Sequence, residues 1–314
     1  MSFFLGIDTS NYTTSVALYD SETKNVISKK KLLPVKEGEK GIRQSDAVFH
    51  HTGQIRELLP ELLELASSDI KAVTVSIKPR FVDGSYMPCF TVGHTVASAV
   101  ASALGVPLFL VSHQEGHVTA ALFSAGRLDL VGKDFLAFHV SGGTTESLLI
   151  TKSERCPVSA TTLGTSSDLK AGQAVDRVGV MLGLKFPCGP ELEKLALSSN
   201  YEVGKIRASM KGRDCSLSGL ENKCKKMFDD GEKAEDIALF CLKYIEEVLK
   251  AMLSSVLTEE KLPVVFSGGV MSNSILQNGL REYCEGLGIE AFFAEPQYSS
   301  DNAVGVAILG SYLI

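Results

Sequence analysis

His113 and His117 have the spacing of a metal-binding pair. On a helix, residues four apart lie on one face, about 5–6 Å apart at Cβ, so both imidazoles can reach one metal ion. The segment reads His-Gln-Glu-Gly-His, so it lacks the HExxH pattern and the general base that zinc peptidases take from it. Two imidazoles leave a metal short of ligands, and a helix with two partly buried histidines and no metal is the alternative interpretation.

Asp301 is the carboxylate that could complete this set. It stands in the segment SSDNAVGVAILG (299–310), at the start of an expected helix of small apolar residues. An aspartate in that place is commonly an N-cap, whose side chain accepts a hydrogen bond from the first helical turn. The sequence leaves both interpretations open, since a third ligand of the carboxylate type is also what a two-histidine site requires.

Three turns rich in Gly, Ser and Thr follow apolar strands and suit the binding of phosphate. They are IDTSNYTTS (7–15), VSGGTTES (140–147) and FSGGVMSN (266–273). In such turns backbone N–H groups can converge on phosphate oxygens, and glycine allows the close approach. A single SGG turn is common, but two of them with a related third turn predict a nucleotide site. The chain has no GxxxxGK[ST] motif and is therefore not a P-loop protein.

A fourth group of polar residues lies on one predicted helix in 164–196. Asp168, Gly172 and Asp176 share this helix, and Asp176 could accept hydrogen bonds from ribose hydroxyls. The turn Pro-Cys-Gly-Pro that ends at Pro190 opens the next helix, whose N-terminus suits an anionic or polar ligand. Taken alone, acidic residues on a helix are more often surface charges.

The charge balance argues against a protein that covers nucleic acid by bulk charge. The chain of 314 residues has 31 Lys and Arg against 37 Asp and Glu, a formal net charge of −6. Two runs of basic residues could still face a phosphate backbone, although such runs are often solvated surfaces. They are the segment 29–43, with Lys29, Lys30, Lys31, Lys36, Lys40 and Arg43, and the segment 205–226, with Lys205, Arg207, Lys211, Arg213, Lys223, Lys225 and Lys226.

Composition favours a cytoplasmic globular protein. Seven cysteines without a CxxC pair suggest neither a disulfide framework nor a cysteine zinc site, and they fit a reducing compartment. The first ten residues lack the basic and apolar regions of a signal peptide. The uncharged stretch 84–114 is interrupted by Gly105 and Pro107, so it is too short to cross a membrane as one helix.

Apolar strands and helices alternate along the chain, which is typical of an α/β fold. The strand–turn–strand segment at 4–18 has a similar copy 131 residues later, with six of fifteen positions identical. An internal repeat at this distance predicts a duplicated domain, although similar composition can also arise independently. The expected helices cover 45–66, 91–104, 113–125, 169–183, 189–198, 216–228, 233–256 and 273–286, with a last helix from about 301.

In order and spacing, these motifs resemble the TsaD family of tRNA threonylcarbamoyladenosine synthase subunits, once called sialoglycoproteases. The resemblance covers nearly the whole chain. It implies an actin/hexokinase/Hsp70-like (ASKHA) fold of two duplicated subdomains around a central cleft. We therefore expect one subdomain from 1–112 and 299–314 and a second from 113–298, which carries a helical insertion.

The resemblance also assigns roles to residues of this chain. It implies that a divalent transition metal, Fe or Zn, is held by His113, His117 and Asp301, with Asp8 and Ser10 as weaker catalytic candidates. It implies an adenine nucleotide or acyl-adenylate, with Mg²⁺ as a further candidate cofactor. The nucleotide contacts fall on Ser141, Gly142, Gly143, Asp176, Gly189 and Asn273. The expected acceptor is tRNA, with TsaB-like and TsaE-like partner proteins and no membrane.

Several motifs depart from the family pattern. The acidic pair expected after the first strand is replaced by Tyr12-Thr13, and Thr144 stands where the family has a histidine. The segment 76–88 lacks the family's GPG loop, and 168–176 keeps only part of the DDAAGEAFD motif. These changes indicate a diverged paralogue, either an active transferase or a partner subunit that binds nucleotide or metal without catalysis. A kinase of the same fold or a metallopeptidase are further alternatives.

Overall fold

The computed structural model describes residues 2–34, 42–66 and 69–314, and the chain forms two compact units. Unit 1 comprises Met1–Lys133, Thr151–Ser159 and Gln297–Ile314, and unit 2 comprises Asp134–Ile150 and Ala160–Pro296. The segments 113–133 and 151–159, expected in the second subdomain, therefore lie in unit 1. The helix in 113–133 packs against the C-terminal helix of that unit, which explains the first difference.

Unit 1 is built on a mixed sheet with strand order β3-β2-β1-β4-β5. β1 pairs antiparallel with β2 and parallel with β4, and β5 continues the sheet in parallel. The apolar runs of the sequence account for β1, β2 and β4, which are mostly buried, whereas most of β3 at one edge of the sheet is exposed. The strands are β1 (Phe3–Asp8), β2 (Thr13–Asp20), β3 (Val26–Leu32), β4 (Ile70–Ser76) and β5 (Leu108–Val111).

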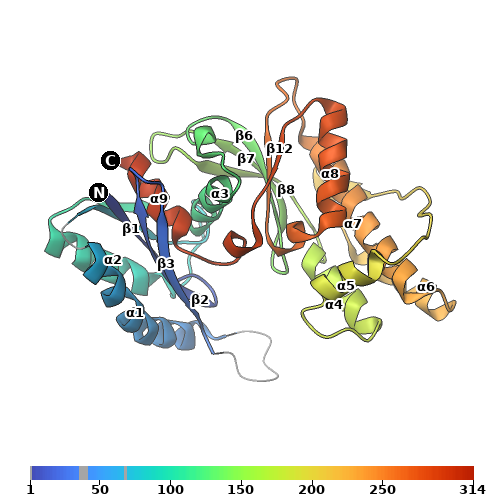
Figure 1. The fold of residues 1–314 in the computed structure, drawn as a ribbon, viewed down its shortest axis with the longest axis horizontal. Coiled ribbons are helices and arrows are strands. Elements are labelled where there is room, and N and C mark those ends of the chain that lie inside the picture. The colour runs from blue at the N-terminus through green and yellow to red at the C-terminus, as the bar shows by residue number, and fades with distance from the viewer. Residues whose placement is uncertain (1, 35–41, 67–68) are drawn as a thin grey trace. The chain divides into compact units, whose positions relative to one another are not determined.

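Helices cover both faces of this sheet, as Figure 1 shows. α1 (Gln44–Ala66) and α2 (Phe90–Leu104) pack on one face, where Leu5 and Ile7 of β1 enter their apolar core. α9 (Val304–Leu313) packs on β1, β2 and β4 within a second core that contains Phe4. Because side chains alternate along a strand, β1 supplies both cores from successive residues.

α3 (His113–Ser124) crosses α9 at very short range. A Cβ atom on Gly305 would overlap the carbonyl oxygen of Gly116, and one on Gly116 would lie 2.8 Å from Val306. Likewise, a Cβ atom on Gly6 would overlap the backbone of α9. Glycine at these positions lets the two helices and β1 approach backbone to backbone.

Unit 2 repeats the strand order of unit 1, which confirms the duplicated α/β fold. Its sheet has the order β12-β11-β6-β7-β8, with β6 antiparallel to β7 and parallel to β11. A separate hairpin pairs β9 with β10. The strands are β6 (Phe135–Val140), β7 (Thr145–Thr151), β8 (Ser159–Thr165), β9 (Ser209–Lys211), β10 (Asp214–Ser216), β11 (Val264–Ser267) and β12 (Ala291–Phe293).

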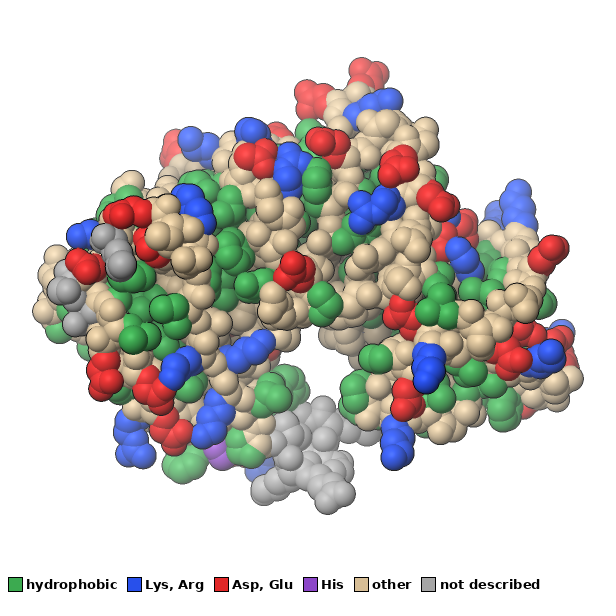
Figure 2. Space-filling view, viewed as in Figure 1, with side chains coloured by type: hydrophobic (Ala, Val, Ile, Leu, Met, Phe, Trp, Pro, Cys, Tyr) green, Lys and Arg blue, Asp and Glu red, His purple; other side chains and the backbone are tan. Residues whose placement is uncertain are grey.

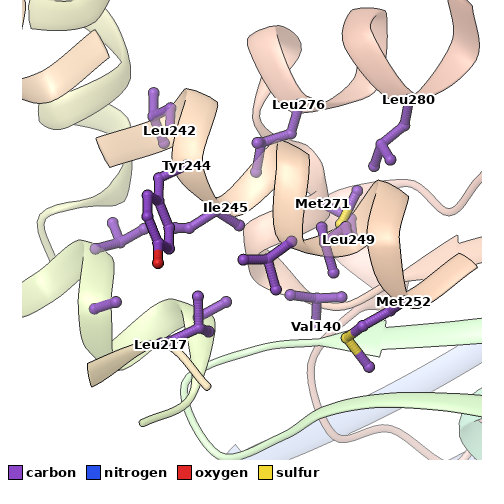
Figure 3. Close-up of a cluster of buried hydrophobic side chains, with 14 of the residues drawn as sticks. Val140, Leu217, Leu242, Tyr244, Ile245, Leu249, Met252, Met271, Leu276 and Leu280 are labelled. Atoms are coloured by element: carbon purple, nitrogen blue, oxygen red, sulfur yellow. The ribbon is translucent and has the colours of Figure 1, made fainter. Parts of the chain in front are cut away.

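One long amphipathic helix forms the centre of the core of unit 2. α7 (Ala234–Val256) buries Leu242, Ile245 and Leu249 among side chains of the neighbouring helices and of β6 (Figure 3). Their spacing at three and four residues places them on one helix face. The other helices of the unit are α4 (Ala171–Met181), α5 (Gly189–Ala196), α6 (Ser218–Asp229) and α8 (Ser274–Leu287).

Some predicted elements differ from those in the structure. β8 and the β9–β10 hairpin were not expected, because these strands are short or rich in threonine and little buried. Asp168 precedes α4 rather than lying on it. Asp301 does not begin a helix: α9 starts at Val304, whose N–H donates to the side chain of Asn302. Asp301 is therefore not the N-cap residue of α9.

On the face of the molecule in Figure 2, Lys and Arg side chains are interspersed with Asp and Glu. Of the helices in the described part of the chain, none combines the length and the hydropathy needed to span a bilayer. All seven cysteines are buried and unpaired. Lys36 and Lys40, two members of the first basic run, lie outside the described residues.

Candidate metal centre and nucleotide pocket

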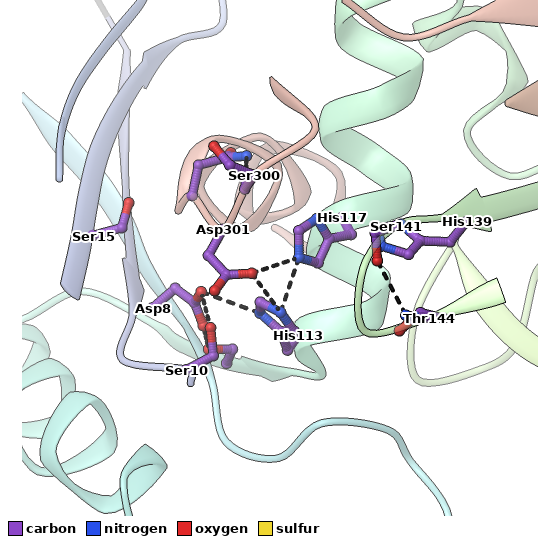
Figure 4. Close-up of polar contacts among 12 residues, drawn as sticks. Asp8, Ser10, Ser15, His113, His117, His139, Ser141, Thr144, Ser300 and Asp301 are labelled. Atoms are coloured by element: carbon purple, nitrogen blue, oxygen red, sulfur yellow. Dashed lines mark hydrogen bonds and ion pairs between the residues drawn. The ribbon is translucent and has the colours of Figure 1, made fainter. Parts of the chain in front are cut away.

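His113, His117 and Asp301 come together within unit 1 (Figure 4). The Nε2 atoms of the two imidazoles lie 2.9 Å apart. Oδ1 of Asp301 lies 3.4 Å from Nε2 of His113 and 3.2 Å from Nε2 of His117. The two histidines lie on the first two turns of α3, as their spacing predicted. Asp301 follows His117 by 184 residues in the sequence, and the crossing of α3 and α9 brings the two side chains together.

Asp8 stands behind this cluster, at the end of β1. Its Oδ2 lies 3.1 Å from Nδ1 of His113 and accepts a 2.6 Å hydrogen bond from the hydroxyl of Ser10. The hydroxyl of Ser76, at the end of β4, donates to Oδ1. Asp8 and Ser10 are both fully buried. An Nδ1–H that donates to Asp8 leaves the lone pair of Nε2 for a metal, which is the usual arrangement of a ligating histidine with a carboxylate behind it.

The charges of the cluster stabilise one another. Burial opposes a charged imidazole, but the negative charge of Asp8 and the hydrogen bonds to Asp301 and Asp8 raise the pKa of His113 to about 10. Burial also opposes the charged form of Asp301, yet hydrogen bonds from His113 and His117 hold the pKa of its carboxyl well below its usual value. The pKa of Asp8 is lowered for the same reason, against its burial, mainly by the charge of His113.

The first turn of α3 is fixed by further hydrogen bonds and an ion pair. Ser112 and Glu115 form a capping box, in which each side chain accepts from the other residue's backbone N–H. Arg155 pairs with the buried carboxylate of Glu115, and its guanidinium lies 3.5 Å from the ring centroid of Phe81. Phe81 belongs to the segment 76–88. The carbonyl of Lys78 in the same segment accepts from the N–H of His113.

The donor set suits a divalent transition metal. Two imidazole nitrogens and one carboxylate oxygen, all within 4.8 Å of one another, are the ligands that Fe, Zn and Mn accept in proteins. Three protein ligands leave a position open for substrate or water. Among the described residues, His113, His117 and Asp301 are the His, Cys, Asp or Glu side chains that come close enough together to hold one metal ion.

The turn between β1 and β2 holds the positions where the expected acids are replaced. Asn11 adopts a left-handed conformation, with φ of 46°, which asparagine tolerates better than most residues. Tyr12 is 42 % exposed, whereas Thr13 is buried at the start of β2. The turn therefore places one aromatic side chain at the surface.

In unit 2, the two SGG turns lie side by side at one edge of the sheet. β6 and β11 are parallel neighbours, so the turns that follow them begin at the same edge. Gly268 has φ of 99°, and a Cβ atom there would overlap the carbonyl of Val140. The first turn lies on the start of α4, where the N–H of Gly172 donates to the carbonyl of Ser141. A Cβ atom on Gly172 would lie 2.6 Å from the nitrogen of Gly142.

A pocket of about 270 Å³ opens beside these turns. Its walls come from both SGG turns, from α4 and α7, and from the start of α5. Apolar side chains alternate with polar groups, as is usual in ligand pockets. The pocket is lined by Gly142, Gly172, Val175, Asp176, Pro187, Gly189, Pro190, Glu193, Leu242, Gly269, Val270, Ser272 and Asn273.

Four of the six predicted nucleotide contacts line this pocket, namely Gly142, Asp176, Gly189 and Asn273. Ser141 and Gly143 belong to the first SGG turn but do not line it. The side chain of Ser141 accepts a hydrogen bond from the N–H of Thr144.

Ser272 was missed, although it belongs to the FSGGVMSN motif. Its buried hydroxyl has no hydrogen-bond partner among the described residues. A Cβ atom on Gly142, Gly189 or Gly269 would meet nothing within 4 Å, so the backbone is accessible there. The unpaired hydroxyl and the accessible backbone suit a polar ligand such as a nucleotide.

Asp168 does not line the pocket, and its carboxylate stabilises the local fold. Its carboxylate accepts hydrogen bonds from the hydroxyl of Ser216 and from the N–H groups of Leu217 and Leu169. Burial opposes its charge, but these hydrogen bonds keep the pKa of the carboxyl well below the usual value. Asp168 thus joins the start of α6 to the segment before α4.

The TsaD family model, described as tRNA N6-adenosine threonylcarbamoyltransferase, matches residues 23–308. A protein of that name from Archaeoglobus fulgidus is 30 % identical over 313 residues, which cover 98 % of this chain and 90 % of the relative. One from Persephonella marina is 31 % identical, covering 98 % of this chain and 88 % of the relative. The chain belongs to the TsaD family. The expected family is thereby confirmed, and with it a family role in threonylcarbamoyl transfer to tRNA.

Solved structures confirm the ASKHA-type fold of this TsaD-family chain. HypF from T. kodakarensis aligns with a TM-score of 0.63 at 13 % identity, covering 99 % of this chain and 48 % of HypF. A ROK-family glucokinase from Streptomyces griseus aligns with a TM-score of 0.54 at 13 % identity, covering 99 % of this chain and 100 % of the glucokinase. At such low identity, these likenesses establish the fold alone.

Proposed function

We propose that this chain transfers a threonylcarbamoyl group from its adenylate to the exocyclic amine of an adenosine in tRNA. A C–N bond forms between the carbamoyl carbon and that amine, and the C–O bond to the adenylate phosphate breaks. AMP leaves with the bonding electrons, and the amine loses one proton. The convergence of His113, His117 and Asp301 in a chain of the TsaD family is the observation that carries the proposal.

His113, His117 and Asp301 would hold one divalent metal, with Fe and Zn as the favoured ions. Such an ion supplies Lewis-acid polarisation of an acyl oxygen. Asp8 contacts His113 and not the solvent, so we assign it a positioning role: it orients the imidazole and fixes its tautomer. Ser10 in turn orients Asp8.

The pocket of unit 2 would bind the adenylate portion. The SGG turns offer backbone N–H groups to phosphate, and Mg²⁺ could accompany the nucleotide there. Val175 and Leu242 offer an apolar wall to the adenine base, while Asp176 faces the same pocket and can accept from ribose hydroxyls. One oxygen of Asp176 already accepts from the N–H of Cys188, which fixes the side chain.

The alternative is a partner subunit that binds nucleotide or metal without transferring the group. The replacement of the acidic pair by Tyr12-Thr13 favours it, since a carboxylate could have served in proton transfer. TsaB-like and TsaE-like proteins are the expected partners in either case.

Transfer of labelled threonylcarbamoyl from its adenylate to tRNA tests the proposal. The assay uses the full chain, alone and with TsaB-like and TsaE-like proteins. We expect transfer that His113→Ala abolishes and that His94→Ala, on exposed α2 surface, leaves unchanged. No transfer in any combination, together with activity gained by Tyr12→Asp/Thr13→Glu, would instead establish the non-catalytic alternative.

A further inference from the structure

The segment 205–226 is strongly basic in an acidic protein. It has seven Lys and Arg and two acidic residues, whereas the whole chain has a net charge of −6. We propose that Lys205, Arg207, Lys211 and Arg213 in this segment form a docking surface for the phosphate backbone of RNA. The inference rests on the proposed function, because it places the tRNA acceptor on a defined part of unit 2.

The acidic residues of the segment do not neutralise these four cations. Asp214 accepts from the N–H of Thr165, and Glu221 pairs with Arg177 of α4. In the described part of the chain, none of the four cations has an acidic partner, and all are exposed. Their charge is therefore available to an external polyanion.

The first basic run differs in this respect. Lys29 pairs with Glu61 and Lys31 with Glu57, both on α1. Lys30 donates to the hydroxyl of Ser300. Two cations of the first run are thus paired with carboxylates, whereas the four cations of 205–213 have no such partner among the described residues, so the segment 205–226 is the better phosphate surface.

Alternation along the chain turns the cations outward. Ile206, Ala208 and Met210 are partly buried against the core of unit 2. The residues that alternate with them, which include Lys205, Arg207 and Lys211, are exposed. The apolar side chains face inward, so this surface lacks the exposed apolar groups that would enter a lipid bilayer, and it suits RNA better than a membrane.

The β9–β10 hairpin fixes the remaining cations. Gly212 has φ of 62°, as a two-residue hairpin turn with glycine in its first position requires, and Arg213 follows it. A Cβ atom on Gly164 of β8 would overlap the carbonyl of Arg213, so the hairpin lies directly on β8. A bridge between Ser166 and Cys215 extends this contact. The backbone that presents Lys211 and Arg213 is therefore already ordered before any ligand binds.

The surface is joined to the nucleotide pocket within the same unit. Asp168 accepts from the N–H groups of Leu217 and Ser218, which follow β10 and begin α6. α6 packs against α4, whose residues Gly172 and Asp176 line the pocket. An RNA bound along 205–213 would thus lie on the same unit as the proposed adenylate pocket, connected to it through α6 and α4.

Salt-dependent binding of tRNA tests this surface. Two double variants, Lys205→Gln/Arg207→Gln and Lys211→Gln/Arg213→Gln, each remove two charges. A third, Lys71→Gln/Lys152→Gln, removes two from exposed positions of unit 1 as the matched control. We expect each test variant to bind tRNA roughly tenfold more weakly at low salt, and its log–log salt slope to flatten by about one for each phosphate that is no longer neutralised. The control keeps the wild-type slope, and ATP binding is unchanged in all three.

Three outcomes would overturn the inference, and they separate it from the proposed function. Wild-type binding of tRNA with unchanged slopes in both test variants would refute the surface alone. If the test variants lost binding to phosphatidylserine vesicles as strongly as binding to tRNA, the surface would not be specific for RNA. Failure of the wild-type chain to bind tRNA at any salt concentration would refute the acceptor in the proposed function as well.

Discussion

Gly305 of α9 lies against Gly116 of α3 so closely that a Cβ atom on Gly305 would overlap the carbonyl oxygen of Gly116. Gly116 stands between His113 and His117, and Gly305 follows Asp301 by four residues. The contact between the two glycines therefore sets the distance at which the imidazoles and the carboxylate meet.

Gly305→Ala should separate α3 from α9 and weaken metal retention. Forcing a methyl group into this contact should lower the free energy of unfolding by about 1–3 kcal/mol. The measurements are metal content after gel filtration and denaturant unfolding. Gly53→Ala is the control: a Cβ atom there meets nothing within 4 Å in α1, and alanine should stabilise that helix by about 0.5–1 kcal/mol. Wild-type stability and metal content in Gly305→Ala would contradict the packing argument.

Asp8→Asn should weaken metal binding without removing a ligand. Loss of the carboxylate behind a ligating histidine typically costs 10–100-fold in metal affinity. Competition with a chelator measures the affinity, using Zn²⁺ as the probe. Asp129→Asn, which removes one charge from an exposed site of unit 1, should bind Zn²⁺ like the wild type. If both variants bind equally well, Asp8 does not position His113.

Gly172→Ala should displace the first SGG turn and reduce nucleotide affinity. The added Cβ atom would lie 2.6 Å from the nitrogen of Gly142, so the turn must shift. We expect roughly tenfold weaker binding of an ATP analogue by calorimetry, the equivalent of about one missing hydrogen bond to a charged group. Gly286→Ala in α8, where a Cβ atom meets nothing within 4 Å, should bind normally. Unchanged binding by Gly172→Ala would place the nucleotide elsewhere.

His51 should make the protein less stable in mild acid. Burial lowers its pKa to about 4, although the charge of Asp8 works in the opposite direction. The unfolded chain, with an ordinary histidine pKa near 6.5, then binds the proton more tightly than the folded chain does. Stability is therefore lost as the pH falls from about 6.5 to 4, by about 1–3 kcal/mol in total.

Unfolding curves of His51→Asn across this pH range test the assignment. The hydroxyl of Thr14 donates to Gln54, so Nδ1 of His51 donates to Thr14, and an asparagine amide can replace that donor. We expect a flatter pH dependence than in the wild type. The exposed His94→Asn should keep the wild-type dependence. Identical slopes in all three proteins would show that His51 does not titrate between folded and unfolded states.

Short-range patterns in the sequence were sufficient to predict the local features of both sites. The four-residue spacing of His113 and His117 places them on one face of a helix through helical periodicity alone. The two SGG motifs after apolar strands indicated paired turns, because parallel neighbouring strands end at one edge of a sheet. The order of the motifs was sufficient to indicate the family, which the family model confirms.

Contacts between distant side chains could not be predicted in this way and follow from the fold. Asp301 could have been an N-cap, and Asp168 was expected on the same helix as Asp176. In the fold α9 begins only at Val304, whose N–H donates to Asn302, and Asp168 accepts from the N–H of Leu217 before α6. The fold also places Asp8 behind His113. Local patterns cannot supply these contacts, because residues 49 to 184 positions apart meet only where remote backbones pack closely. For Asp301 and the two histidines, the glycines at the α3–α9 crossing set that distance.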